Sequence, residues 1–248
     1  MRKVELARYL DGFLRVAEIP DSCVNGLEVE AEGDVSKIAL AVDATLENFM
    51  RAKERGADFI LVHHGMIWDK APISGLLYKR VKFLIENDLA LYAAHLPLDL
   101  NPEVGNNAEL ARIVGLKSRA PFGVYHGQAI GFKGYIDPIR FDDLVRKIGN
   151  SLGHEAQWIH AGSDIVESIG ICSGSAPELF KEAVKENLQV FLTGEVSHQL
   201  VGEAEDSGVN IIFAGHWATE TVGVKALGRH ISEKFGLPAV FVGEDTGF

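Results

Sequence analysis

The chain has 248 residues, of which 47% are hydrophobic and 24% are charged. This composition excludes a disordered or fibrous chain, and the length suffices for one large domain or two modest domains that share a core. A formal net charge of -11 makes nucleic acid an unlikely partner, because binding a phosphate backbone requires clustered Lys and Arg. The net charge does not exclude small anionic substrates, because a metal ion reverses the local field within an acidic protein.

Cysteine use and the amino terminus indicate the compartment. Cys23 and Cys172 are too few for the disulfide framework of a small secreted domain, so we expect free thiols. Charged residues interrupt residues 1–8, where a signal peptide needs an unbroken apolar stretch. No segment reaches the roughly 18 consecutive apolar residues of a membrane span. We therefore expect a cytoplasmic protein with no membrane span.

Hydrophobic periodicity predicts an alternation of helices and strands through the first half of the chain. The expected elements are a helix near 3–17, strands around 26–30 and at 38–42, a helix at 45–55, a strand at 58–62, a helix at 74–87, a strand at 89–94 and a helix near 105–114. The strand, helix and strand over 38–62 indicate a parallel βαβ unit with buried strands.

The second half continues the α/β pattern. We expect a strand over 127–136 and a helix over 140–153, after which the alternation resumes at 169 and continues to 242. The Cys-Ser-Gly-Ser stretch at 172–175 lacks the spacing of a phosphate loop or a nucleophile elbow, so it predicts a tight turn between a strand and a helix.

The two halves resemble each other in sequence. Residues 38–65 align without gaps on residues 169–196, with strand and helix patterns in step. Each half then reaches an apolar strand followed by two small residues and His-x-x-x-acid, at 92–99 and at 213–220. Chance similarity between two βαβ units is the alternative, but the repeated His-x-x-x-acid favours duplication.

This similarity predicts an α/β fold of two pseudo-repeated lobes, over 1–124 and 125–248. No low-complexity linker separates the lobes, so we expect them to be packed together or interwound as one unit, with a metal site between them.

His63 and His64 close the apolar strand at 58–62. In an open α/β sheet, ligand sites gather at the carboxyl ends of the strands, so two imidazoles there are well placed for binding. For an isolated His-His pair, one buried and one solvated histidine is the commoner arrangement.

His216 and Glu220 open a predicted helix, where residues four apart share one face and can hold the same ion. Imidazole with carboxylate suits zinc, iron, manganese or nickel. The alternative is a helix-start pair in which Glu220 complements the helix dipole.

Asp99 follows another strand end, and Pro97 is expected to keep the residues before it from being helical. An aspartate that bonds loop amides is the alternative. Three strand ends that each present imidazole or carboxylate groups would supply enough donors for two divalent ions. The predicted ligands are His63, His64, Asp99, His216 and Glu220.

Two further residues are candidates for proton transfer. His95 is interpreted as a proton carrier or as a group that supports a ligand, in preference to a ligand itself. Glu195 lies at the strand end that matches His64 in the alignment of the halves, which suits a residue in the wall of the site. An ordinary loop carboxylate is the alternative. The other histidines share no spacing and are expected to be surface or structural residues: His126, His154, His160, His198 and His230.

Five stretches in order resemble the YbgI-like dinuclear-metal-centre hexameric proteins, often labelled GTP cyclohydrolase I type 2 homologues. They are Asn-Gly-Leu at 25–27, Val-His-His-Gly at 62–65, residues 92–99, Thr-Gly-Glu at 193–195 and residues 214–220. The resemblance covers nearly the whole chain, and the apolar Leu-Pro-Leu before Asp99 is a minor departure from it. It implies two intertwined α/β repeats, two metal ions on the five predicted ligands, and a toroidal homohexamer whose sites face an internal cavity.

Two functions from different classes follow. The first is a metal-dependent hydrolase that acts on a small nucleotide or related metabolite, GTP cyclohydrolase-like by resemblance, in which His95 or Glu195 moves protons. The second is a non-enzymatic metal carrier or hexameric scaffold. Carriers more often use exchangeable Cys or Met ligands, and both cysteines lie apart from the histidines in sequence, so the first is preferred. A closed structural metal core is a third alternative.

Overall fold

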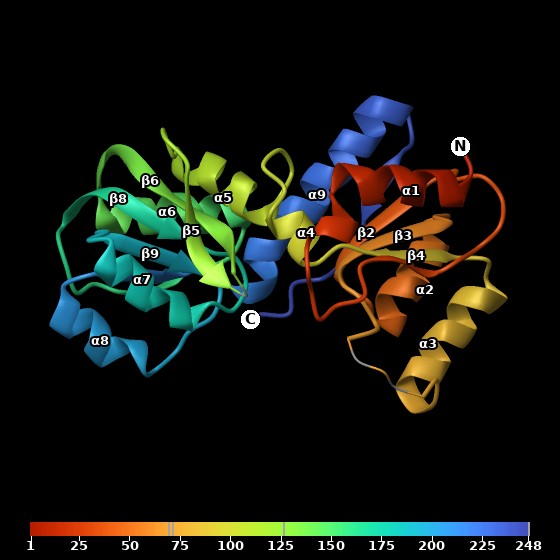
Figure 1. Ribbon diagram of the computed structural model, residues 1–248, viewed down its shortest axis with the longest axis horizontal. Coiled ribbons are helices and arrows are strands. Elements are labelled where there is room, and N and C mark those ends of the chain that lie inside the picture. The colour runs from red at the N-terminus through yellow and green to blue at the C-terminus, as the bar shows by residue number, and fades with distance from the viewer. Residues whose placement is uncertain (69, 71, 126, 248) are drawn as a thin grey trace. The chain divides into compact units, whose positions relative to one another are not determined.

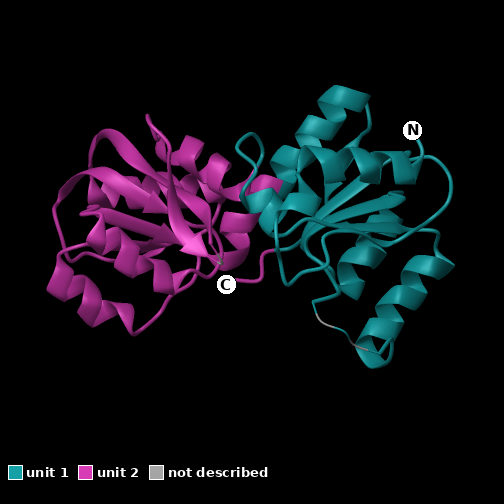
Figure 2. Ribbon diagram, viewed as in Figure 1, with its two compact units in different colours: residues 1–104, 224–244 teal, residues 105–223, 245–248 magenta. Residues whose placement is uncertain are grey.

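The computed structural model describes residues 1–68, 70, 72–125 and 127–247. Strands and helices alternate along the chain, which confirms the predicted α/β class (Figure 1). The chain divides into two compact units (Figure 2): unit 1 comprises residues 1–104 and 224–244, and unit 2 comprises residues 105–223 and 245–248. The predicted repeats over 1–124 and 125–248 remain a prediction.

Unit 1 is built on a five-stranded sheet in the order β1-β4-β3-β2-β11. Strand β1 is antiparallel to β4, and the other pairs are parallel. The strands are β1 (Gly26–Val29), β2 (Ile38–Asp43), β3 (Phe59–His64), β4 (Ala90–Ala93) and β11 (Ala239–Phe241). The helical segments are α1 (Lys3–Phe13), the 3-10 helix η1 (Val16–Glu18), α2 (Leu46–Glu54), α3 (Gly75–Glu86) and α4 (Leu96–Asp99).

Helices cover both faces of this sheet, which explains why its central strands are continuous apolar runs. Alternate side chains of β2 enter different cores: Ile38 packs in a cluster with residues of α1 and α9, and Ala39 packs in a cluster with residues of α2 and α3. Figure 1 shows α1 on one side of the sheet and α2 and α3 on the other. Buried hydrophobic side chains of the parallel strands contribute to both clusters.

Unit 2 is built on a six-stranded sheet in the order β5-β6-β8-β9-β10-β7. The central strands β8, β9 and β10 are parallel, and the flanking pairs are antiparallel. The strands are β5 (Ala120–Tyr125), β6 (Gln128–Arg140), β7 (Gln157–Ile159), β8 (Ile165–Ile171), β9 (Val190–Thr193) and β10 (Asn210–Phe213). The helices are α5 (Asn106–Val114), α6 (Phe141–Leu152), the 3-10 helix η2 (Pro177–Leu179), α7 (Phe180–Lys185), α8 (Leu200–Ser207) and α9 (His216–Phe235), which begins in unit 2 and ends in unit 1.

The aligned halves of the sequence have the same local topology. In unit 1, the parallel strands β2, β3 and β4 are connected by α2 and α3, and in unit 2 the parallel strands β8, β9 and β10 are connected by α7 and α8. Ile38 pairs with Phe59, and the aligned Ile169 pairs with Val190. The similarity between the halves therefore corresponds to one supersecondary pattern that occurs in both units.

Several expected elements differ from the observed ones. The first helix ends at Phe13 rather than near 17, and β3 includes His63 and His64 instead of ending before them. The expectation that Pro97 keeps the residues before it from being helical is wrong for Leu96, which is the first residue of α4. Pro97 lies in the first turn of this helix, where its missing N–H has no intrahelical partner to lose. Strand β5 was not expected, because Pro121 and Gly123 interrupt its pattern; both are tolerated in an edge strand.

Among the described residues, no helix combines the length and the apolar character needed to cross a membrane.

Candidate metal centre

Three histidines of unit 1 gather at the carboxyl ends of neighbouring parallel strands. His63 and His64 are the last residues of β3, and His95 follows β4 as the residue that precedes α4. One ring nitrogen from each lies within 4.8 Å of the others. Parallel pairing of β3 with β4 brings the strand ends together, so the sheet itself assembles this cluster.

Each of these imidazoles is oriented through its Nδ1 atom. The Nδ1 atom of His63 lies 2.9 Å from the backbone oxygen of Ala94, and that of His64 lies 2.9 Å from Oδ1 of Asp43. The Nδ1 atom of His95 lies 3.0 Å from both carboxylate oxygens of Asp21. An acceptor oxygen at Nδ1 favours the proton on that atom and leaves the lone pair on Nε2, which is the form of imidazole that binds a metal.

Asp99 joins the unit 1 cluster through the short helix α4. Its buried carboxylate places Oδ2 3.6 Å from Nε2 of His63. The helical turn is what brings it there, because the amide of Asp99 donates to the carbonyl of His95 at 3.2 Å. The structure thus brings together the three predicted ligands of the first half: His63, His64 and Asp99.

Asp21 is a residue of this cluster that sequence reasoning missed. Burial alone would raise its pKa, but hydrogen bonds from His95, Asn25 and the amide of Leu96 lower the pKa to about 2. The Oδ1 atom of Asn25 also accepts from the backbone amide of His95 at 2.7 Å. The Asn-Gly-Leu stretch at 25–27 therefore belongs to the framework that positions His95, which is the signal through which Asp21 could have been sought.

Glu28 supports the loop that follows His64. Its carboxylate accepts from the amides of Met66 and Ile67 at 2.8 and 2.9 Å, and burial raises its pKa. A Cβ on Gly65 would lie 2.5 Å from Oε1 of Glu28 and 2.8 Å from Cβ of Ala93. Glycine is therefore required where this loop leaves β3.

The predicted residues of the second half lie next to each other in unit 2. His216 is the first residue of α9, and its Nε2 lies 3.1 Å from Oε2 of Glu220 one turn later. The Nδ1 atom of His216 lies 2.5 Å from Oε1 of Glu195. Hydrogen bonds from Ser175 and then from His216 lower the pKa of Glu195, although burial opposes this. Unit 2 therefore uses the same Nδ1 orientation as unit 1.

The turn at 172–175 packs directly against this pair. Gly174 has φ +64°, and a Cβ there would lie 2.3 Å from Oε1 of Glu220 and 3.4 Å from Nε2 of His216. The amide of Gly174 donates to Oγ1 of Thr219 at 3.0 Å, which fixes the turn to α9. The expected tight turn is present, and its contact with the predicted ligands was not foreseen.

Most other histidines have structural surroundings. His230 stacks on Phe13 with ring centroids 4.1 Å apart, and His160 stacks on Phe141 at 5.1 Å. His198 is exposed, and His154 lies 3.5 Å from a carboxylate oxygen of Asp245. His126 lies outside the described residues.

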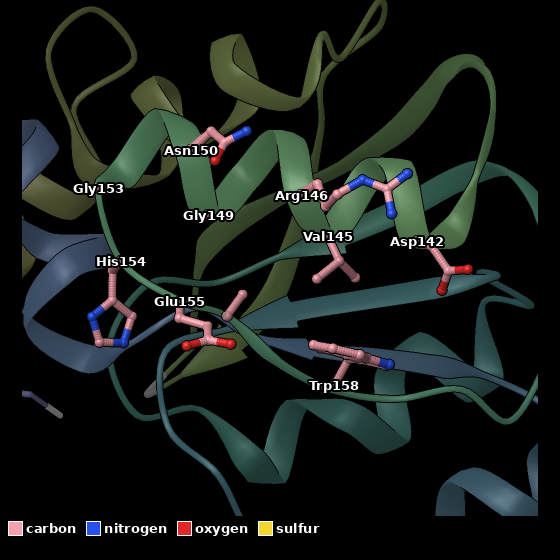
Figure 3. A pocket seen from close by; sticks show the side chains of 10 residues that line it. Asp142, Val145, Arg146, Gly149, Asn150, Gly153, His154, Glu155 and Trp158 are labelled. Carbon is pink, nitrogen blue, oxygen red and sulfur yellow. The ribbon is translucent and has the colours of Figure 1, made fainter.

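Unit 2 also contains a cavity of about 680 Å³ between α6, the loop after it and β7. Figure 3 shows Arg146 and Asp142 of α6 and Trp158 of β7 around it. None of the clustered donors lines this cavity, so its size does not make it the candidate metal centre.

Residues 1–246 match the sequence model of Duf34/NIF3 (NGG1p interacting factor 3). The chain belongs to the Duf34/NIF3 family. A Pyrococcus horikoshii member named GTP cyclohydrolase 1 type 2 homolog is 41% identical over 250 residues, which cover 100% of both chains. A second relative with that name, from Deinococcus radiodurans, is 40% identical over 98% of this chain and 93% of its own.

Two solved structures share the whole fold of this chain. TTHA1606 from Thermus thermophilus has a TM-score of 0.93 and 38% identity, and each chain is covered completely. The protein ybgI, described as of unknown function, has a TM-score of 0.92 and 32% identity, again over both whole chains. The resemblance inferred from the five sequence stretches is thereby confirmed.

Proposed function

We propose that this Duf34/NIF3 protein is a metal-dependent hydrolase with a dinuclear site. The proposed ligands are His63, His64, Asp99, His216 and Glu220. One observation supports this most: all three proposed imidazole ligands have an oxygen acceptor at Nδ1. Metal-binding histidines need this arrangement, because it sets the tautomer and holds the ring in place.

The donor chemistry fits a pair of divalent ions. Imidazole and carboxylate together accept zinc, iron, manganese or nickel, and cellular supply decides among them. Each cluster alone offers fewer donors than two ions require, since even one tetrahedral ion takes four ligands. We therefore propose that all five ligands serve one dinuclear centre, as the family resemblance implies.

A bound pair of divalent ions supplies an activated water and polarises the bond under attack. The chain's own residues do the rest. With Asp21 at Nδ1, the imidazole of His95 can take up or release a proton at Nε2, so we propose it as the proton carrier. Glu195 contacts His216, so we propose that it positions this ring and retain it as the second candidate for proton transfer.

The substrate proposal rests on the names of the relatives. GTP cyclohydrolase 1 type 2 homolog is what the curated relatives are called, and a nucleotide or related metabolite is accordingly the substrate class we propose. The family resemblance also underlies the proposal of a homohexamer, and the two cysteines, expected to be free thiols, underlie the proposal of a cytoplasmic location. Sedimentation of the 27.0 kDa chain tests the first, because six copies form a particle of about 160 kDa.

A metal carrier or scaffold is the competing function, and the cysteines argue against it. Burial raises the pKa of Cys23 to about 12, and Cys172 is also buried. Neither thiol is therefore poised to exchange a metal as an exposed thiolate would be.

The deciding experiment compares the protein purified with its native metals with the double variant His64→Ala, Glu220→Ala. We expect two ions per chain and turnover of at least one compound in a nucleotide panel, and loss of both in the double variant. His198→Ala, which removes an exposed histidine outside the clusters, should change neither. Equal turnover in the double variant contradicts a metal-dependent hydrolase, whereas bound metal without turnover in the unmodified protein favours the carrier.

A further inference from the structure

A second cavity, of about 370 Å³, opens beside His64 within unit 1. Its walls include Thr45 at the start of α2, Trp68 in the loop after β3, and Arg80 on α3. The volume lies in the range of small-molecule sites, which are roughly 300–1,000 Å³. Thr45, Trp68 and Arg80 are neither proposed ligands nor proposed proton carriers.

Arg80 gives the cavity a positively charged group. Among the residues that the structure describes, no carboxylate forms a salt bridge with it, whereas Arg51 on α2 pairs with both Glu47 and Glu244. A guanidinium presents five N–H donors in a plane that matches phosphate and carboxylate oxygens. A half-buried guanidinium in a cavity wall is therefore equipped to bind an oxyanion.

The cavity also contains a carboxylate, that of Asp43. Its Oδ1 atom is directed at His64 and lies 2.9 Å from Nδ1 of that ring. The chain as a whole carries a formal charge of -11, so an anionic ligand needs a local cation to approach His64. Thr45 accepts from the amide of Asn48 at 3.2 Å, which leaves its own hydroxyl hydrogen to donate to the same anion.

Trp68 adds a flat apolar wall. Its indole N–H donates to the carbonyl of Gly65 at 2.9 Å, which fixes the ring, and 37% of the residue is exposed. The ring centroid lies 6.0 Å from that of His64 and 4.9 Å from that of His95. A planar group stacked on this indole would therefore lie beside two histidines of the candidate metal centre.

We propose that this cavity is the substrate's anion subsite: Arg80 and Thr45 bind the phosphate of a phosphorylated small molecule, and Trp68 stacks on its planar ring. The inference deepens the proposed function and rests on it in one respect, namely that His64 belongs to the reaction centre. It assigns the substrate class from this chain's own side chains rather than from the names of its relatives.

The test measures binding to the protein with its native metals by calorimetry. The three probes are GMP, guanosine and inorganic phosphate, and succinate is added as a carboxylate control. Arg80→Gln should weaken the binding of GMP and phosphate about 10-fold or more, because hydrogen bonds to a charged group are lost, and should leave the binding of guanosine unchanged. Trp68→Leu should weaken GMP and guanosine without affecting phosphate. Lys79→Gln removes the same charge from the neighbouring position of α3. It should leave the affinities for all three probes within about twofold of those of the unmodified protein.

Unchanged binding of GMP and phosphate to Arg80→Gln overturns the proposal. So does succinate binding that depends on Arg80 as strongly as phosphate binding does, since the anion would then be a carboxylate. Metal content and turnover, measured on every variant, separate this inference from the proposed function. If the unmodified protein turns over no substrate but still binds GMP in an Arg80-dependent way, only the hydrolase proposal is contradicted. If Arg80→Gln leaves turnover and KM unchanged, only the subsite proposal is contradicted.

Discussion

The oxygen atoms that contact Nδ1 of the imidazoles determine how well the histidine clusters can bind a metal. His64 and His95 are held by carboxylates, and His63 by a backbone carbonyl. A carboxylate at Nδ1 raises the basicity of the ring as a ligand and fixes its direction, and such partners contribute about 10–100-fold to metal affinity. The partner residues therefore belong to the centre as much as the ligands do.

Replacing the partner of His64 should weaken the centre without removing a ligand. We expect Asp43→Asn to lower metal affinity about 10–100-fold, because the amide orients the ring less firmly and carries no charge. Competition with a chromogenic chelator measures this. Asp34→Asn, at an exposed carboxylate of the same unit, is the control and should bind metal like the unmodified protein. Equal affinity in Asp43→Asn would show that the contact is only structural.

The Asp21 carboxyl should make stability depend on pH in the acid range. Its folded pKa of about 2 lies below the ordinary value of 3.8, so the folded state favours the charged form. The resulting stabilisation, about 2 kcal/mol, is complete above pH 4 and is lost as the pH falls towards 2. Urea unfolding should thus show a deficit for Asp21→Asn at pH 5 that shrinks near pH 2.5. A deficit independent of pH would contradict the assignment.

The ligands were easier to predict from the sequence than their partners. His63, His64 and His216 adjoin apolar strands, and that local pattern is visible in the chain. Asp21 lies in a loop 74 residues before His95, and the hydrophobic pattern around either residue does not indicate their contact. Such contacts depend on how loops fold over the strand ends, which periodicity does not encode.

At the scale of elements, the parallel strands were predictable because burial on both faces leaves them uniformly apolar. Elements at the margins were not. β5 carries Pro121 and Gly123 and exposes Val124, so its pattern is that of a loop. α4 is a single turn whose only local signal, Pro97, equally suits a helix start and an extended segment. That ambiguity matters, because the turn of α4 brings Asp99 to His63.

The turn at Gly174 offers a test of how one element shapes the site. Gly174→Ala introduces a Cβ 2.3 Å from the carboxylate of Glu220 at a residue with φ +64°. Gly153→Ala is a matched control, since Gly153 has φ +69° and no atom within 4 Å of its would-be Cβ. Both variants should lose about 1 kcal/mol of unfolding free energy from backbone strain. Only Gly174→Ala should also lose metal, as measured by elemental analysis; equal metal content in the two would contradict the contact.

At the scale of the whole molecule, unit 1 is discontinuous in sequence. The chain leaves it after residue 104, forms unit 2, and returns within α9, whose first residue is the proposed ligand His216. The similarity between the halves of the sequence corresponds to the shared βαβ topology, whereas the passage of α9 from unit 2 into unit 1 has no signature in periodicity. It depends on which sheet each half of the helix packs against.

Metal binding should therefore stabilise the entire chain, since the proposed ligands come from both units. A metal at about 100 times its Kd that binds only the folded state adds about 2.7 kcal/mol, and chelation with EDTA should remove this and lower the Tm. Protons compete for the imidazole nitrogens, so the loss on chelation should be smaller at about pH 5 than at about pH 7.5. Calorimetry with and without EDTA measures both effects. The double variant His64→Ala, Glu220→Ala should show no change with EDTA, and a chelation effect as large as that of the unmodified protein would place the metal elsewhere.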